Sequence, residues 1–317
     1  MKKTTITIVI PVFNVEKFVN DTLSSVKNQI SQADEVIVIN DGSTDGSFNI
    51  INNFRHLQGW KIIQTHNQGL GLTRNFGRSM ANSDYIYFLD SDDIIKNDLI
   101  LRVRKTIHQY NQPDIILFSG ESFNYNGPKN KELNLKFTLQ GEYLRGHKLI
   151  TKLLNKKETL PQVSRYITKV ELWTKNKLDY PEGIAEDEAL FFPLLALSER
   201  AVIIPEVYYN YRVGRPGSIT LSTPSSKHAR DYLNRICSFM EFMNLKYDLI
   251  KIDHAAWRYR LGRNGLHYIS MCLQTKTPIN WNIILVLFFK AKSLSLLFKL
   301  LWRILRHYFL NNDLKNK

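Results

Sequence analysis

Three carboxylates stand within four residues at Asp90-Ser91-Asp92-Asp93. Carboxylates so close together repel one another unless a cation neutralises them. Oxygen ligands of this kind suit a hard divalent ion, Mg²⁺ or Mn²⁺, and such an ion can also bridge the oxygens of a diphosphate. The run of three carboxylates therefore predicts a metal site that holds a diphosphate-bearing substrate. The alternative is that Asp92 or Asp93 only stabilises the start of a following helix.

Two further polar segments could join that run in one cleft. Pro11-Val12-Phe13-Asn14 and Asn40-Asp41-Gly42-Ser43-Thr44-Asp45 each follow an apolar segment typical of a buried strand. If those strands are parallel, their carboxyl ends lie at one edge of the sheet, where the ligands of α/β proteins collect. The same residue types are common in turns and helix caps, so a purely structural role stands beside the binding role.

A second acidic cluster, Glu186-Asp187-Glu188, precedes the apolar pattern ALFFPLL. The structural interpretation is an acidic first helical turn, which the helix dipole favours. The catalytic interpretation is a general base, because a helix N-terminus keeps a carboxylate ionised and able to take a proton from an attacking hydroxyl.

The elements that would position these residues alternate regularly over the first third of the chain. Apolar β-type runs alternate with amphipathic helical patterns, which predicts βα units and a mainly parallel sheet. The expected strands are residues 6–13, 35–40, 60–65, 85–90 and 114–119, and the expected helices are 15–28, 47–54, 70–80 and 98–110.

The pattern changes from about residue 121. A polar stretch with Gly and Pro predicts loops and an antiparallel hairpin. Helical patterns follow at 147–156, 170–177 and 186–197, VIIPEVYYNYRV predicts strands around Pro205, and the chain beyond residue 225 is expected to be almost wholly helical to about residue 310. We therefore expect a nucleotide-binding half (1–120), an acceptor-binding half (121–225) and a helical C-terminal extension (226–317).

The composition limits the choice of partner. The chain has 317 residues, a net charge of +14 and 44% hydrophobic residues, which fits a folded protein with an anionic partner. Much of the basic excess lies on an apolar C-terminal segment and no nucleic-acid-binding motif is present, so we expect no nucleic acid. No apolar run reaches the roughly 18 residues of a membrane span. Two cysteines make no disulfide framework, and we expect a cytoplasmic location.

Five segments, in this order, resemble the bacterial family 2 glycosyltransferases. They are IVIPVFNVEKFVNDTLSSVKNQ, EVIVINDGSTDGS, NQGLGLTRNFGRSMANSDYIYFLDSDD, YPEGIAEDEALFFPLL and YYNYRVGRPGSIT, and the resemblance runs from about residue 5 to residue 220. It implies the GT-A nucleotide-sugar-binding fold, a mostly parallel central sheet and a nucleotide-sugar donor, UDP-linked in most such enzymes.

The resemblance also implies a role for each candidate residue. The loop against the nucleotide base contains Pro11, Phe13 and Asn14, Asp41 recognises the base, and Arg74 binds the nucleotide. The Asp-x-Asp motif consists of Asp90, Ser91 and Asp92, and it binds the diphosphate and the Mn²⁺ or Mg²⁺ ion. The catalytic base is Asp187, with Glu186 as the alternative.

The family is inverting, which implies a single displacement with a base on the acceptor side and a metal on the leaving side. The Gln-x-x-Arg-Trp motif of processive synthases is absent, so the resemblance is to the non-processive members. Arg212, Arg215 and Ser218 could close as a lid over the diphosphate, although Arg212 could equally be a surface cation.

The implied acceptor is a saccharide or lipid-linked saccharide of capsule, lipopolysaccharide or another surface glycan. The alternative function is an inactive GT-A-like binding or scaffold protein, against which the retained carboxylates argue.

The last segment, WNIILVLFFKAKSLSLLFKLLWRILRHYFL, combines a basic stripe with a broad apolar face. The stripe has a spacing of three or four residues and consists of Lys292, Ser295, Lys299, Arg303 and Arg306. Such a helix is typical of proteins that lie in the plane of a membrane surface, here the inner face of the cell membrane. The alternative is packing on the enzyme's own body or on a second subunit of an oligomer.

Overall fold

The computed structural model describes residues 4–125, 133–156, 158, 161–183, 186–218, 223–250 and 254–291. The chain forms two compact units, Met1–Leu221 and Ser222–Lys317. The division of the first unit into a nucleotide-binding and an acceptor-binding half stays a prediction.

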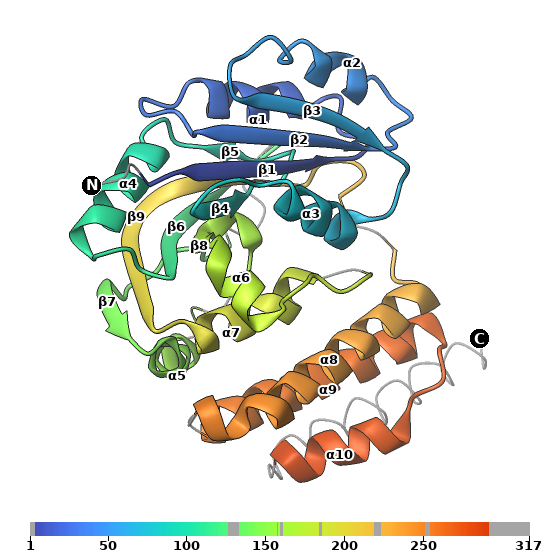
Figure 1. Ribbon diagram of the computed structural model, residues 1–317. Coiled ribbons are helices and arrows are strands. Elements are labelled where there is room, and N and C mark those ends of the chain that lie inside the picture. Colours follow the sequence, from blue (N-terminus) through green and yellow to red (C-terminus); the bar gives the residue numbers. More distant parts are fainter. Residues whose placement is uncertain are drawn as a thin grey trace. The chain divides into compact units, whose positions relative to one another are not determined.

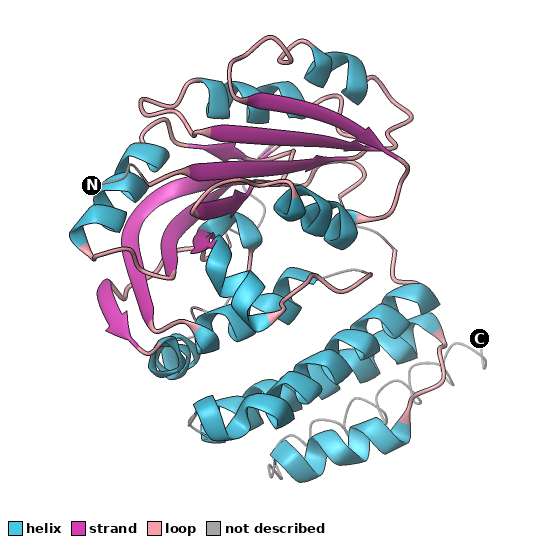
Figure 2. Ribbon diagram, in the orientation of Figure 1, coloured by secondary structure: helices cyan, strands magenta, loops and turns pink. Residues whose placement is uncertain are grey.

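The first unit is built on one nine-stranded sheet in the order β3-β2-β1-β4-β8-β6-β9-β5, with β7 paired to β9 (Figures 1 and 2). The strands are β1 (Ile6–Val12), β2 (Glu35–Asp41), β3 (Trp60–Thr65), β4 (Tyr85–Phe88), β5 (Ile94–Ile95), β6 (Ile115–Asn124), β7 (Gly141–Leu144), β8 (Tyr166–Lys169) and β9 (Arg200–Val213). The longest pairings are parallel: β1 with β2, β2 with β3, and β6 with β9. The predicted α/β fold with a mostly parallel sheet is confirmed.

Helices connect the strands of this unit. They are α1 (Val19–Lys27), α2 (Ser47–Asn52), α3 (Leu70–Ser79), α4 (Leu99–Gln109), α5 (Gly146–Lys156), α6 (Val170–Asn176) and α7 (Glu186–Leu197), with a 3₁₀ turn at Val163–Arg165. Each predicted helix is present, with ends that differ by a few residues at most.

Burial on both faces of the sheet explains the continuous apolar runs. All seven residues of β1 are buried, as expected for a central strand with packing on both sides. Ile8 and Ile10 join the main core, whereas Val9 faces α3. There the backbone of Gly77 comes so close that an added Cβ would lie 2.4 Å from Val9 Cγ1. Close packing of α3 on β1 and β2 thus fixes the helix that carries Arg74.

Three short strands were not predicted. β8 is antiparallel to both β4 and β6, and it separates two groups of parallel strands. β5 and β7 each pair in an antiparallel direction with β9. The expected strands around Pro205 are one strand, β9, whose register against β6 shifts between Phe118 and Gly120. Part of the expected hairpin after residue 121, residues 126–132, lies outside the described residues.

The second unit is helical, as predicted, as far as the structure describes it. Its helices are α8 (Ser226–Ile250), α9 (His254–Thr275) and α10 (Trp281–Ala291). Ile284 and Leu287 of α10 are buried, whereas Trp281, Leu285 and Val286 are exposed. In the described ranges, no helix is long and apolar enough to cross a membrane. The predicted basic stripe, Lys292 to Arg306, lies outside them.

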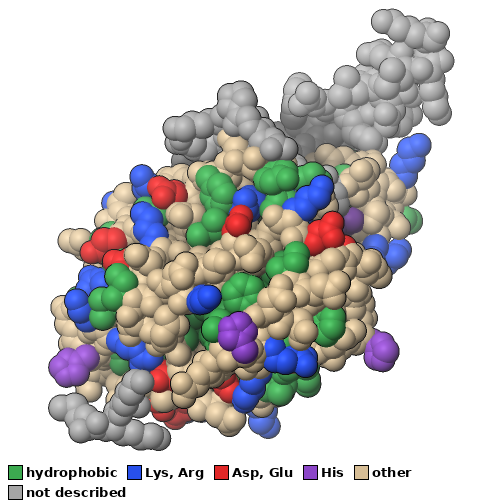
Figure 3. All heavy atoms as spheres, turned by 90° about the horizontal axis from the view of Figure 1, so that it is seen from above, with side chains coloured by type: hydrophobic (Ala, Val, Ile, Leu, Met, Phe, Trp, Pro, Cys, Tyr) green, Lys and Arg blue, Asp and Glu red, His purple; other side chains and the backbone are tan. Residues whose placement is uncertain are grey.

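The net charge of +14 is not gathered into one patch on the face seen in Figure 3. Lys and Arg side chains there lie dispersed among acidic and apolar ones.

Candidate functional site

The loops that follow β1 and β2 are joined to each other. Figure 1 shows both strands ending at the same edge of the sheet. Asn14, with a φ of 50°, accepts a hydrogen bond from the Thr44 amide at 2.8 Å through Oδ1 and donates its own amide to Ser43 Oγ at 3.1 Å. Pro11 is buried in β1, and Phe13, beside Asn14, keeps 45% of its surface exposed. An exposed aromatic ring on a fixed loop provides a flat surface for a planar ligand.

Asp41, the last residue of β2, organises the start of α3. One carboxylate oxygen accepts the Gln68 amide at 3.0 Å and the Thr65 hydroxyl at 3.2 Å, and the other accepts the Gly69 amide at 3.0 Å. The side chain is therefore buried, with 3% exposure, and both of its oxygens have partners. Its place at the strand end agrees with the prediction, and its predicted contact with a base stays a prediction.

Arg74 and Asp90 form an ion pair at the centre of this edge. Arg74, on α3, is 2% exposed, and its Nη2 lies 2.6 Å from Asp90 Oδ1. The guanidinium also lies 5.4 Å from the centre of the Tyr180 ring. Asp90 follows β4 and keeps 29% of its side chain exposed. The sequence predicted both residues as ligand-binding, and the structure brings them into contact.

The acidic run does not precede a helix directly, since Ile94 and Ile95 form β5 and α4 begins at Leu99. The interpretation of Asp92 or Asp93 as a helix-dipole residue is therefore wrong. Ser91 is buried, and its carbonyl accepts the Thr22 hydroxyl at 2.9 Å, which holds the run on α1.

Asp93 has a structural position that the sequence did not indicate. It is fully buried, and its two oxygens accept the Tyr209 hydroxyl at 2.5 Å and the Arg212 amide at 2.7 Å. Burial raises the pKa of the Asp93 carboxyl well above its usual range, and the charges of Asp92 and Asp90 raise it further. Asp93 thus joins the acidic run to β9.

Arg212 is not a surface cation, because it is 7% exposed. Its guanidinium lies 5.1 Å from the centre of the Phe18 ring and 4.8 Å from that of Phe123. Its Nε donates to the Asp92 carbonyl at 2.7 Å, and Nη2 donates to Asp21 Oδ2 at 3.1 Å. Arg212 thus joins the end of β9 to α1 and to the acidic run, and its predicted lid role stays a prediction.

Arg215 reaches the carboxylate of Asp92. Its Nε donates to Asp92 Oδ2, and the two side chains are 12% and 14% exposed. Burial raises the pKa of the Asp92 carboxyl, with Arg215 opposing this rise and Asp90 adding to it. The Ser218 amide donates to the Arg215 carbonyl at 3.3 Å. The predicted lid role of Arg215 and Ser218 stays a prediction.

Asp187 lies in the first turn of α7 and is partly buried. The segment before it is tied to α3, since the Asn75 side chain bonds the Tyr180 backbone at 2.9 and 2.8 Å and Arg78 pairs with Asp179. This tie holds the segment before α7 against α3, the helix that carries Arg74. The side chain of Glu186, the alternative base, lies outside what the structure describes.

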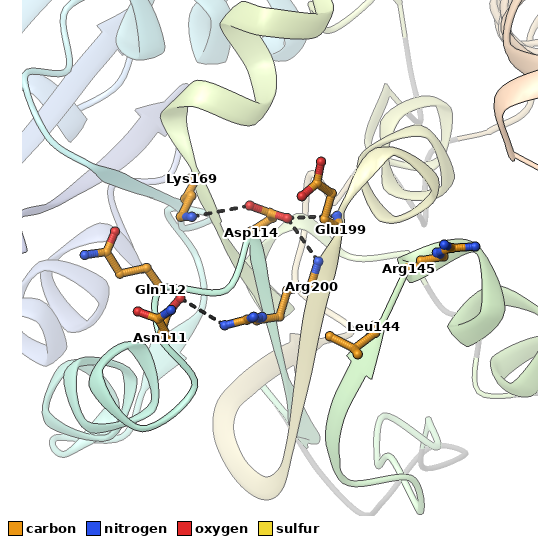
Figure 4. A pocket seen from close by; sticks show the side chains of 8 residues that line it. All are labelled: Asn111, Gln112, Asp114, Leu144, Arg145, Lys169, Glu199 and Arg200. Carbon is orange, nitrogen blue, oxygen red and sulfur yellow. Dashed lines mark hydrogen bonds and ion pairs between the residues drawn. The ribbon is translucent and has the colours of Figure 1, made fainter.

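A separate cavity of about 600 Å³ lies at the opposite edge of the sheet (Figure 4). It stands at the amino ends of β6 and β9, beside Lys169, which pairs with the first residue of β4. Asp114 at its centre accepts the backbone amides of Glu199 and Arg200 at 2.8 and 3.0 Å and pairs with Lys169 at 3.4 Å. These contacts join the strand ends, and Arg145 lies apart from them (Figure 4). The cavity contains none of the predicted site residues.

The family model described as Glycosyl transferase family 2 matches residues 7–166, about half of the chain. The chain belongs to glycosyl transferase family 2. The matched range contains every predicted nucleotide-binding and metal residue, but it ends before Asp187, Arg212, Arg215 and Ser218.

Curated relatives agree with that membership. Glycosyltransferase GlyA of Streptococcus pneumoniae is 30% identical over 226 residues, which cover 68% of this chain and 31% of GlyA. The poly(ribitol-phosphate) β-N-acetylglucosaminyltransferase TarS of Staphylococcus aureus is 24% identical over 216 residues, 66% of this chain and 36% of TarS. The chain thus matches about a third of the length of each of these relatives.

A solved structure shows the same fold. The crystal structure of S. aureus TarS 1-349 in complex with UDP-GlcNAc aligns with a TM-score of 0.61 and 20% sequence identity, covering 90% of this chain and 88% of that chain.

Proposed function

We propose that the protein transfers a sugar from a UDP-sugar to a hydroxyl of a saccharide acceptor, with inversion at the anomeric carbon, in the synthesis of a bacterial surface glycan. The observation that carries this proposal is the Arg74–Asp90 ion pair, held at the strand edge where the Asn14 and Asp41 loops meet. Family membership, and relatives that include a UDP-GlcNAc complex and poly(ribitol-phosphate) glycosyltransferases, support it.

In this proposal the first loops bind the nucleoside. The exposed ring of Phe13 stacks on the uracil, and Pro11 and Asn14 keep that loop in place. Asp41 recognises the base from the end of β2. Arg74 offers its guanidinium donors to the nucleotide while its salt bridge to Asp90 fixes their direction.

The acidic run would hold the diphosphate and a divalent ion. Within the described residues no three His, Cys, Asp or Glu side chains are grouped to hold a metal by themselves. Mg²⁺ in phosphate-transfer sites needs only one or two carboxylates, with phosphates and water completing its shell. Asp90 and Asp92, two carboxylates of one short loop beside Ser91, fit that requirement. When bound, Mn²⁺ or Mg²⁺ would neutralise charge on the departing diphosphate.

Asp187 is the proposed base. It accepts the proton of the acceptor hydroxyl as that oxygen forms its bond to the anomeric carbon. The bond from the anomeric carbon to the diphosphate oxygen breaks in the same displacement, and its electron pair leaves with UDP. The position of Asp187 in the first turn of α7 favours the ionised form that a base requires.

The test separates binding from transfer. Asp187→Asn should abolish UDP release from UDP-GlcNAc with Mn²⁺ and poly(ribitol phosphate), while calorimetry shows unchanged UDP binding. Glu182→Gln is the matched control, since it removes a carboxylate five residues earlier and should change neither reading. Loss of UDP binding in Asp187→Asn would contradict the base assignment. A thermal-shift panel of UDP-sugars with and without Mn²⁺ identifies the donor. If the wild-type protein binds none of these sugars and releases no UDP, the alternative function, an inactive binding or scaffold protein, replaces the proposal.

We also propose that the second unit contacts a membrane surface at the inner face of the cell membrane, where a lipid-linked acceptor would lie. The exposed apolar side chains of α10 support this, since Trp281, Leu285 and Val286 are 49%, 54% and 43% exposed. In flotation with anionic liposomes, the Trp281→Ser/Leu285→Ser variant should float less than wild type. Equal recovery of the two proteins would contradict membrane contact through this face.

A further inference from the structure

We propose that Arg215 is the resident counter-ion of Asp92 in the nucleotide-free protein, and that its guanidinium must leave this carboxylate before Asp92 can ligate a divalent cation. The inference rests on the proposed function, which assigns Asp92 to the metal. It adds a competitor for that site from within the chain, 123 residues along the sequence.

The environment of Asp92 explains why a counter-ion is needed. Its side chain is 14% exposed, and Asp90 and the buried Asp93 stand beside it. A carboxylate with so little access to water is stable as an anion only with a cationic partner. Arg215 Nε donates to Asp92 Oδ2, and the Arg215 guanidinium lies 5.6 Å from the centre of the Phe18 ring.

Arg212 cannot take the same part. Its backbone belongs to β9 and its amide is bonded to Asp93 at 2.7 Å. Its side chain is held between two aromatic rings, and it meets Asp92 only at the backbone carbonyl, 2.7 Å from Nε. It therefore leaves the Asp92 carboxylate to another cation.

Arg215 is attached differently, because it stands two residues past the end of β9, after Gly214 with its φ of 79°. Its contacts with the acidic run are made by the side chain, so rotation of side-chain bonds is enough to release Asp92. Arg74 differs again: it is 2% exposed on α3, and its partner Asp90 keeps 29% exposure, so that pair can stay closed while Asp90 meets a ligand.

Two consequences follow from the exchange. A divalent cation alone binds weakly, because Arg215 must first give up Asp92 and gains nothing in return. A nucleoside diphosphate changes this balance, since its phosphate oxygens offer the freed guanidinium a new anionic partner. Metal and nucleotide therefore bind with positive coupling, and Arg215 carries part of the coupling free energy.

The test measures Mn²⁺ binding directly, by the electron paramagnetic resonance signal of the free ion, with and without UDP. Without UDP, Arg215→Gln should bind Mn²⁺ roughly tenfold more tightly than wild type, which corresponds to about 1.4 kcal/mol. UDP should then strengthen Mn²⁺ binding by a smaller factor in Arg215→Gln than in wild type. Arg145→Gln, the same charge change at the opposite edge of the sheet, should match wild type.

Arg215→Lys guards against a folding defect in Arg215→Gln. Lysine keeps the charge but lacks the planar fork of donors, so Mn²⁺ without UDP should bind roughly threefold more tightly than in wild type. Thermal unfolding adds a second reading: Mn²⁺ should raise the melting temperature of Arg215→Gln more than that of wild type.

Equal Mn²⁺ affinity of wild type and both Arg215 variants without UDP overturns the inference. So does an absence of Mn²⁺ binding to all of these proteins even with UDP, which would remove the metal assignment as well. Failure of the proposed function is read separately, as an absence of UDP release by the wild type, and the order of the Mn²⁺ affinities can still be measured in that case.

Discussion

Asp93 offers the sharpest test of how the acidic run is built. Asp93→Ala removes the acceptor of two buried donors, the Tyr209 hydroxyl at 2.5 Å and the Arg212 amide at 2.7 Å. A buried donor left without a partner costs about 1–3 kcal/mol, so for two donors we expect a loss of about 2–6 kcal/mol in the free energy of unfolding. Urea denaturation measures this loss.

Asp93→Asn should behave differently from Asp93→Ala. The amide oxygen can still accept the Arg212 amide, and the amide nitrogen can donate to the Tyr209 oxygen. Burial, together with Asp92 and Asp90, raises the pKa of the Asp93 carboxyl, so a neutral side chain is tolerated there. We expect a loss of at most about 1.5 kcal/mol, the usual contribution of one hydrogen bond.

The control for this series is Asp98→Ala, a partly exposed aspartate at the start of α4 whose side chain makes no cap hydrogen bond. It should lose less than about 0.5 kcal/mol, as is usual for surface positions. Equal destabilisation by Asp93→Asn and Asp93→Ala would refute the reasoning, because it would mean that the negative charge, and not the acceptor geometry, holds β9 to the acidic run.

Three further predictions concern other parts of the first unit. Burial and neighbouring cations lower the pKa of His147 from 6.5, so the unfolded chain binds more protons than the folded one below that pH, and stability falls as the pH decreases. His147→Asn should therefore flatten the pH dependence of the melting temperature, and an unchanged slope would contradict this. Gly77→Ala should cost about 1–3 kcal/mol in urea denaturation, because its Cβ would lie 2.4 Å from Val9 Cγ1, whereas Ser79→Ala on the same helix should cost little. Phe13→Ala should weaken UDP binding in calorimetry by about 1–3 kcal/mol with little change in stability, since the ring is 45% exposed; an unchanged affinity would exclude stacking.

The sequence was sufficient for the elements that depend on local pattern. The strands β1, β2 and β3 are runs of at least six residues with strong β propensity, and the buried pattern of α1, Val19, Leu23 and Val26, has helical spacing. The polar residues Asn14, Asp41 and Asp90, at the ends of β1, β2 and β4, could be placed on one edge because parallel strands share a direction. β5 could not be predicted, because two residues are too few to show a period, and β8 is defined by its antiparallel pairing with β4 and β6, which its own residues do not indicate.

Contacts between distant residues account for the rest. Nothing near Asp93 indicates that its partner is the Arg212 amide, 119 residues later. Arginine is usually a surface residue, and the burial of Arg212 depends on Phe18 and Phe123, which lie in two other parts of the chain. The sequence shows a tyrosine-rich strand pattern followed by a second arginine, but it does not show that β9 ends at Val213, which leaves Arg212 in the strand and Arg215 in the loop beyond it.

The same long separation determines the order in which the site can form on the ribosome. The strands β1 to β4 are complete once residue 88 has emerged, and their pairings with one another need nothing further along the chain. The acidic run emerges next, but its cationic neighbours on β9 and beyond follow more than a hundred residues later. Because domains form from the N-terminus during synthesis, Asp90 can pair early with Arg74, whereas the Asp92 and Asp93 side chains lack their partners until the chain has been made as far as Arg215. Docking of β9 is therefore both the last step of the sheet and the step that makes the acidic loop stable.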